Sequence, residues 1–262
     1  MGIVTDGALD LDIARFASGL NPTSLIFLDD SYMSRFEATV LRSFREKRRS
    51  YICLDRTIFH PKMGGQPNDE GFIESASGRI QIDKVFISSG VIVHVGLIVE
   101  GDTPKTGEAV YGWIDWSRRY RIMRRHTAGH LLDYCISKIL CKAVRTVDVW
   151  MGDRCYTTYD TYIPVDKLRE IELEANRMIE IDRDVYALYL DFEELQRLYP
   201  DAPNLYRIPK GLDKYRIIVI DGCNGIPCTG THVRRLSEIG VIKLDNVEYI
   251  ENHSKIYYDV YP

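Results

Sequence analysis

Hydrophobic and polar positions alternate in short runs along the first half of the chain, and such runs predict β-strands. The clearest of them lie at Arg49–Leu54, Ile80–Ile87 and Val91–Val95. Ser88-Ser-Gly90 separates the last two runs as a hairpin turn would. We expect a short strand at Leu25–Asp29, whereas Phe36–Arg45 fits either a helix or a twisted strand. The pattern predicts a small β-barrel domain over residues 22–113, preceded by an N-terminal extension over residues 1–21.

The pattern changes at Trp116. From Trp116 to Leu140 the apolar residues recur at helical spacing without a proline, which predicts a long helix. Further helices are expected at Asp166–Ile181 and Phe192–Tyr199. Further strands are expected at Val144–Met151, Cys155–Tyr159, Val185–Leu190, Tyr215–Ile220, Ile239–Leu244 and Ile256–Val260. Because strands and helices are interspersed and hairpin turns recur, we predict an α+β fold with an antiparallel sheet over residues 114–262.

Composition narrows the class of protein. The chain has 262 residues, a formal net charge of −4 and 45% hydrophobic residues, as expected for a globular protein with an ample core. No apolar run reaches the roughly 18 residues of a membrane span. Residues 1–21 lack the basic start and apolar middle of a signal peptide. The six cysteines are unevenly spaced, unlike a disulfide framework. We therefore expect a cytoplasmic protein without membrane association.

Two clusters of metal-binding residue types stand out against this ordinary composition. His126 and His130 lie four positions apart on the long predicted helix, and Cys228 and His232 have the same spacing about a hundred residues later. Imidazole and thiolate ligands together favour zinc over magnesium or calcium. Either pair alone is a weak signal, but together they supply four ligands, so we predict one zinc site. Cys223 is a rival ligand, which we interpret as a turn or core thiol.

Basic residues precede the first histidine directly. Five arginines lie within eight residues, at Arg118, Arg119, Arg121, Arg124 and Arg125. A second basic cluster comprises Arg42, Arg45, Lys47, Arg48 and Arg49. Clusters of this kind are often solvated faces of an element. Their position beside a metal motif favours contacts with phosphate, whose oxygens suit the guanidinium fork.

Several segments together resemble the editing domain of alanyl-tRNA synthetases. They are Leu54-Asp-Arg-Thr57, Gly64-Gly-Gln-Pro-Asn-Asp-Glu-Gly71, Arg124-Arg-His-Thr-Ala-Gly-His-Leu-Leu132, Cys228-Thr-Gly-Thr-His-Val233 and Glu238-Ile-Gly240. The resemblance covers about residues 22–260, and the chain leaves no room for an aminoacylation domain. It is therefore similar to free-standing alanyl-tRNA editing proteins of the AlaX type, in the medium-length form that retains the barrel.

The resemblance implies a zinc-dependent hydrolase that removes serine, and also glycine, from mischarged tRNA(Ala). It implies that Gly64, Gly65 and Gln66 help to place the RNA. The sequence adds Arg124 and Arg125 as candidate phosphate contacts. The alternative is a non-catalytic RNA-binding protein with a structural zinc. A metalloprotease is disfavoured because Thr127 stands where that motif has its glutamate. No protein partner and no catalytic base can be inferred from the sequence.

Thr127 is our candidate for recognising the serine hydroxyl, because it follows the first metal ligand and carries a donor and an acceptor. The alternative is a hydrogen bond from its hydroxyl to a carbonyl of its own helix. The chain also departs from the family pattern at two positions. Gly129 stands where a bulkier residue is usual, which indicates either close packing or extra room beside the metal. Thr229 replaces the first glycine of the usual Cys-Gly-Gly-Thr-His.

Overall fold

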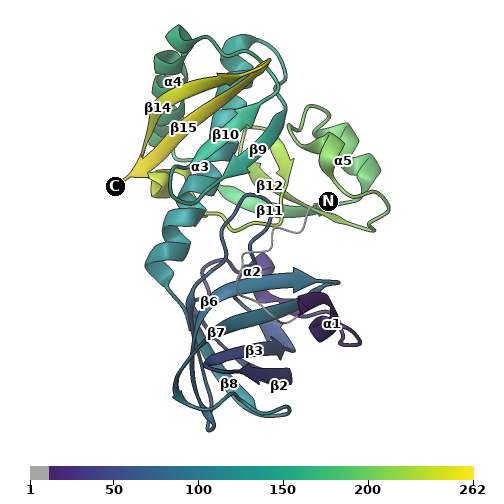
Figure 1. Cartoon of the computed structure of the whole chain (residues 1–262). Coiled ribbons are helices and arrows are strands. Elements are labelled where there is room, and N and C mark those ends of the chain that lie inside the picture. The colour runs from purple at the N-terminus through teal and green to yellow at the C-terminus, as the bar shows by residue number, and fades with distance from the viewer. Residues whose placement is uncertain (1–11) are drawn as a thin grey trace. The chain divides into compact units, whose positions relative to one another are not determined.

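The structure, a computed structural model, describes residues 12–262 and divides into two compact units. The first unit consists of the chain up to Lys62 together with Asn68–Arg118, and the second of Met63–Pro67 together with Arg119–Pro262. Figure 1 labels most of their helices and strands. Residues 1–11 of the expected N-terminal extension lie outside the described residues. Within the described residues, no helix is both long and apolar enough to cross a membrane.

The first unit is built around a closed six-stranded antiparallel barrel with the strand order β2-β3-β7-β6-β5-β8. These strands are β2 (Arg35–Glu46), β3 (Arg49–Leu54), β5 (Gly71–Glu74), β6 (Gly78–Ser88), β7 (Val91–Gly101) and β8 (Ala109–Ile114). Ser89 and Gly90, both with positive φ, form the two-residue turn between β6 and β7. Inward-facing apolar side chains such as Ile52, Leu54 and Ile82 fill the barrel. The predicted barrel is therefore confirmed.

Small elements complete the first unit. They are α1 (Ile13–Ala17), β1 (Ser24–Leu25), α2 (Ile26–Asp29) and β4 (Arg56–Thr57). Leu25–Asp29 was predicted as one strand, and this prediction is wrong. Only Ser24–Leu25 pairs, with β4, and the next four residues turn into α2. The ambiguous segment around Phe36–Arg45 is a strand, because the two neighbours of β2 bond its backbone along almost its whole length.

The second unit contains two antiparallel sheets, with the strand orders β14-β15-β10-β9 and β11-β12-β13. The strands are β9 (Thr146–Trp150), β10 (Tyr156–Tyr159), β11 (Val185–Leu190), β12 (Tyr215–Ile220), β13 (Gly225–Pro227), β14 (Val241–Ile250) and β15 (His253–Tyr261). The helices are α3 (Trp116–Leu140), α4 (Leu168–Ile181) and α5 (Phe192–Leu198), with short 3-10 turns η1 (Val165–Lys167), η2 (Leu205–Arg207) and η3 (Leu236–Ile239). The α+β class predicted from the sequence is confirmed.

Helix α3 is the core element of the second unit. Residues 125–133 of this helix are all buried, so its central turns are covered on every side. It lies against the four-stranded sheet (Figure 1), where the hydroxyl of Tyr258 on β15 donates to the carbonyl of Arg125 at 3.1 Å. Helix α4 covers the edge strand β14, and the Asn176 side chain exchanges two hydrogen bonds with the backbone of Ile242. An otherwise open sheet edge is thereby satisfied.

A buried carboxyl group joins α3 to this sheet. Asp133 Oδ1 accepts hydrogen bonds from the hydroxyls of Tyr159 on β10, at 2.8 Å, and Thr146 on β9, at 3.4 Å. Burial raises the pKa of Asp133 to about 7, although the two hydroxyl donors favour the charged form. In the folded protein the carboxyl therefore holds its proton over a pH range in which it is ionised in the unfolded chain.

We predict that Asp133 makes the protein less stable as pH rises from about 4 to 7. Over this range the folded state binds more protons than the unfolded state, so the free energy of unfolding falls with rising pH. Asp133→Asn keeps the shape and cannot ionise, so it should flatten this dependence. Urea unfolding of both proteins at pH 5 and pH 7.5 measures it. The same loss of stability in both proteins would show that another group is responsible.

Candidate metal centre

The structure brings together the two histidine and cysteine pairs that the sequence singled out. His126 and His130 project from adjacent turns of α3, while Cys228 and His232 come from the loop that follows β13. One potential ligand atom from each of the four lies within 4.8 Å of the others. The three imidazoles are 4 to 8% exposed. Cys223, the rival ligand, is not part of this cluster.

The orientation of His126 is fixed by a hydrogen bond on the side away from the cluster. The Gln66 amide donates from Nε2 to the Thr231 hydroxyl at 2.9 Å, and its Oε1 accepts from the backbone N–H of Thr231 at 3.0 Å. The same Oε1 lies 3.1 Å from Nδ1 of His126, which must therefore donate. The lone pair of Nε2 then faces Cys228, as a metal-binding histidine requires.

His232 is oriented in the same way by Thr127. The Thr127 hydroxyl donates to the carbonyl of Met123 at 2.9 Å, the bond within its own helix that was the alternative to serine recognition. Its oxygen lies 3.1 Å from Nδ1 of His232 and accepts from the backbone N–H of Val233 at 3.2 Å. One donated and two accepted bonds fill the capacity of a hydroxyl. Thr127, which is fully buried, thus sets the tautomer of His232.

The distances around Cys228 fit a bound cation. Its Sγ lies 3.3 Å from Nε2 of both His126 and His232. Zinc bond lengths of about 2.3 Å to sulfur and 2.0 Å to nitrogen place such atoms roughly 3.5 Å apart in a tetrahedron. A thiol proton could satisfy only one of the two lone pairs that face it. The residues therefore fit a metal of the zinc type, and the buried Nδ1 of His130 has no hydrogen-bond partner among the described residues.

Arg216 on β12 holds the loop that carries Cys228. Its guanidinium donates to the carbonyls of Cys228, at 2.8 Å, and Gly230, at 3.0 Å, while its own carbonyl accepts from the N–H of Cys228. Burial raises the pKa of the Cys228 thiol, and the N–H of Gly230 and the charge of Arg216 oppose this. Burial and the charge of Arg216 lower the pKa of His130 to about 3, so this ring is neutral and available as a ligand.

Sequence reasoning missed Arg216. The available signal was a single charged residue within the otherwise apolar and aromatic run Tyr215–Ile220, twelve positions before Cys228. A charge in a buried strand of this kind needs a nearby polar partner. The partners here are main-chain carbonyls, which a sequence pattern does not reveal.

The glycine-rich segment lies in the second unit and supports this site. Gly65, with φ +79°, packs so closely on β9 that a Cβ there would lie 2.2 Å from Cγ2 of Val149. The carbonyl of Gly65 also accepts from the N–H of Met151. This contact delivers Gln66 to His126. Gly64, also with positive φ, has open space around it. A role of this segment in placing RNA remains a prediction.

Arg124 and Arg125 are engaged within the protein. Arg124 donates twice to the carbonyl of Ile239 in η3, at 3.0 and 2.7 Å. Arg125 forms a two-pronged ion pair with Asp259 on β15 and donates to the carbonyl of Gly152. Both guanidiniums therefore join α3 to the rest of the second unit, and the expected phosphate contacts would compete with these bonds. Glu238 likewise accepts from the Tyr120 hydroxyl and from two backbone N–H groups of its own turn.

Comparisons with known proteins show which proteins this chain is similar to. The family model of class II tRNA synthetases (A) matches residues 32–118. The alanine–tRNA ligase of Ignicoccus hospitalis is 32% identical over 259 residues, which is 96% of this chain and 27% of the ligase. That of Methanoregula boonei is 34% identical over 242 residues, 91% of this chain and 26% of the ligase. The alanyl-tRNA editing protein AlaX-L of Pyrococcus horikoshii is 31% identical over 221 residues, 84% of this chain and 53% of that protein.

The chain thus spans about a quarter of these ligases and about half of AlaX-L. The similarity to both kinds of protein includes most of its length.

We predict that Cys228→Ala lowers the affinity for zinc by more than about 100-fold, since even the loss of a residue that only supports a ligand costs 10- to 100-fold. Cys223→Ala, outside the cluster, is the matched control and should leave the affinity unchanged. Zinc competition with a coloured chelator measures both. A larger loss in Cys223→Ala than in Cys228→Ala would reassign the ligand.

Proposed function

We propose that this AlaX-like chain is a trans-editing hydrolase that cleaves the ester joining a wrong amino acid to the 3′ end of tRNA(Ala). Serine is the chief substrate and glycine a second one. The observation that carries the proposal is the cluster of three imidazoles and a thiol, oriented by Gln66 and Thr127. It occurs in a chain of which 84% matches an alanyl-tRNA editing protein.

In this proposal His126, His130, Cys228 and His232 hold a zinc ion. When bound, zinc would polarise the ester carbonyl or lower the pKa of a water molecule. The chain's own residues prepare the site for it. Gln66 and Thr127 present the Nε2 atoms of two histidines, and Arg216 fixes the backbone of the fourth ligand's loop.

The donor set constrains the mechanism. Four protein ligands fill a tetrahedral zinc, whereas a catalytic zinc keeps one position open. No carboxylate belongs to the cluster formed by the described residues. We therefore propose that the four residues would hold an ion that supplies either an exchangeable position for water or a charge that orients the ester, while the neighbouring ribose hydroxyl would help to activate water.

Selectivity for serine over alanine follows from hydrogen bonding. An alanine-activating pocket excludes serine poorly, by roughly a hundredfold, because an apolar site discriminates weakly against one added hydroxyl. A second site that binds this hydroxyl discriminates in the opposite sense. When alanine enters it, a polar group is left unpaired, which costs about 1–3 kcal/mol.

We predict that the zinc-loaded chain releases serine from tRNA(Ala) at least about tenfold faster than alanine, because of this unpaired group. Release from tRNA charged with a radiolabelled amino acid measures the two rates, and a chelator-treated sample is the control. A zinc-loaded chain that binds tRNA(Ala) but releases neither amino acid would favour the alternative function, RNA binding with a structural zinc.

The geometry of Thr127 leads to a separate prediction. Thr127→Val keeps the shape but removes the acceptor for His232, so we expect zinc affinity to fall by about 10- to 100-fold. The ratio of serine to alanine release, measured at saturating zinc, should stay unchanged. If zinc affinity were retained while that ratio fell, Thr127 would be the group that recognises the serine hydroxyl.

A further inference from the structure

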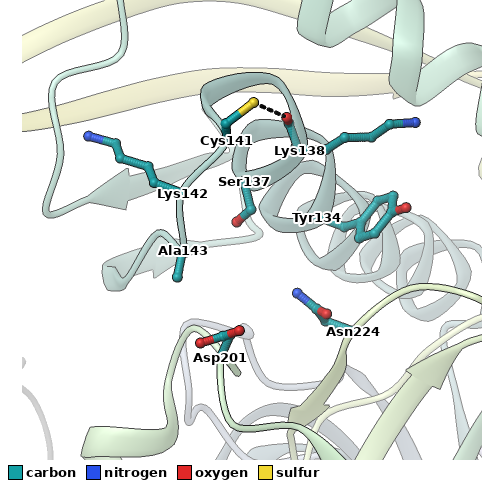
Figure 2. A pocket seen from close by; sticks show the side chains of 8 residues that line it. All are labelled: Tyr134, Ser137, Lys138, Cys141, Lys142, Ala143, Asp201 and Asn224. Atoms are coloured by element: carbon teal, nitrogen blue, oxygen red, sulfur yellow. Dashed lines mark hydrogen bonds between the residues drawn. The ribbon is translucent and has the colours of Figure 1, made fainter.

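An open pocket of about 330 Å³ lies at the C-terminal end of helix α3 (Figure 2). Its lining includes Tyr134, Ser137 and Cys141 from α3 and its end, and Asp201 and Asn224 from two loops of the same unit. The helix ends in a Schellman motif. Cys141 has φ +52°, its N–H donates to the carbonyl of Lys138, and the N–H of Lys142 donates to that of Ser137. This sharp end leaves the space that the pocket occupies.

The pocket lies on the same face of α3 as the metal-binding histidines. With 3.6 residues per turn, one stripe of the helix carries His126, His130, Tyr134 and Ser137. Tyr134 is one turn beyond His130. A rise of about 1.5 Å per residue puts Ser137 roughly 10 Å beyond His130 along the axis. The stripe that supplies two ligands therefore continues directly into the wall of the pocket.

The opposite wall is also tied to the metal centre. Asn224 lies in the turn between β12 and β13, four residues before Cys228. The loop that carries Asp201 is anchored to the same segment, because the Asn204 amide donates to the carbonyl of Pro227 at 2.6 Å. Helix α3, which carries His126 and His130, and the segment that leads to Cys228 therefore both line the pocket.

The groups that face this space suit a nucleobase. Figure 2 shows the side chains of Asn224 and Asp201 facing the end of α3 across the opening. Neither side chain is hydrogen-bonded within the described part of the chain. An asparagine amide can bond an adenine edge with two hydrogen bonds, and a carboxylate accepts from an exocyclic amine. Tyr134 adds an aromatic ring of the kind on which bases stack.

The lysines at the rim supply positive charge outside the pocket. In Figure 2 the head groups of Lys138 and Lys142 extend away from the opening on opposite sides. Lys138 pairs with Glu174 at 2.7 Å, whereas Lys142 donates to the hydroxyl of Thr161 and has no ion-pair partner among the described residues. A cation beside a base-sized pocket is placed to meet the backbone phosphate of a bound nucleotide.

We infer that this pocket binds the adenine of the 3′-terminal nucleotide, with Asn224 and Asp201 on the base edge and Tyr134 against its face. The inference rests on the proposed function, and it names the part of the substrate that lies beyond the ester. With the ester at the metal, the base has to lie within about a nucleoside's length, which matches the roughly 10 Å from His130 to Ser137.

The test uses binding rather than hydrolysis. Zinc-loaded full-length chain is titrated with the trinucleotides CCA and CCG by calorimetry or NMR. We expect CCA to bind at least about tenfold more tightly than CCG, because guanine presents the reversed pattern of donor and acceptor. Asn224→Ala should weaken CCA binding about tenfold and abolish this preference. Tyr134→Leu should weaken both trinucleotides equally.

Asn246→Ala, an exposed asparagine on β14, is the matched control and should bind as the unaltered chain does. Zinc content and thermal unfolding of each variant identify any loss that comes from misfolding. Equal binding of CCA by Asn224→Ala and Asn246→Ala, both folded and zinc-loaded, would overturn the inference. If the chain does not release serine but its preference for CCA depends on Asn224, the proposed function is overturned. The assignment of the pocket then stands.

Discussion

The second unit depends on burying a polar stretch of helix α3, most of whose groups must find partners elsewhere in the chain. Residues 125–133 are all buried and include Arg125, His126, Thr127, His130 and Asp133. A buried charge or polar group that lacks a partner costs several kcal/mol. The partners come from distant parts of the chain. Asp259 pairs with Arg125, Gln66 accepts from His126, Val233 donates to Thr127, and Tyr159 donates to Asp133. The strands, the glycine-rich segment and the metal loop must therefore all be in place before the helix is satisfied.

The same requirement explains how the ligands are arranged. A metal site assembled from two segments a hundred residues apart could close in several geometries. Gln66 and Thr127 remove this freedom, since each accepts from an Nδ1 and leaves the corresponding Nε2 to face Cys228. Arg216 restricts the position of Cys228, because its guanidinium donates to the carbonyls of Cys228 and Gly230. The geometry is thus set by neutral hydrogen bonds and one internal cation.

The sequence was sufficient for features that depend on spacing and periodicity. The barrel, the long helix and the grouping of His126 and His130 with Cys228 and His232 all follow from local pattern. The sequence did not reveal side-chain partners that are remote in the chain. Arg124 and Arg125 have the composition of a phosphate-binding surface, and only the fold reveals that Ile239 and Asp259 engage them. The bond between Thr127 and His232 and the bonds from Arg216 to the loop carbonyls were hidden for the same reason. Leu25–Asp29 failed differently, because a short apolar run does not distinguish a strand from a helical turn.

The two departures from the family pattern have different physical meanings. At Gly129 a Cβ would lie 2.7 Å from the hydroxyl of Tyr258, whose ring is fully buried beneath α3. The tyrosine of the sheet therefore fills the space that a side chain at position 129 would take, which favours close packing over extra room beside the metal site.

The second departure lies in the loop that carries Cys228. Thr229 stands where the family pattern has its first glycine, and Gly230 matches the second glycine of that pattern. A Cβ at Gly230 would lie 2.2 Å from Cε1 of His126 and 2.7 Å from Oε1 of Gln66. Only a glycine lets this loop approach the imidazole closely enough for Cys228 to share its cluster. The loop thus requires glycine at position 230, because this position lies against His126 and Gln66.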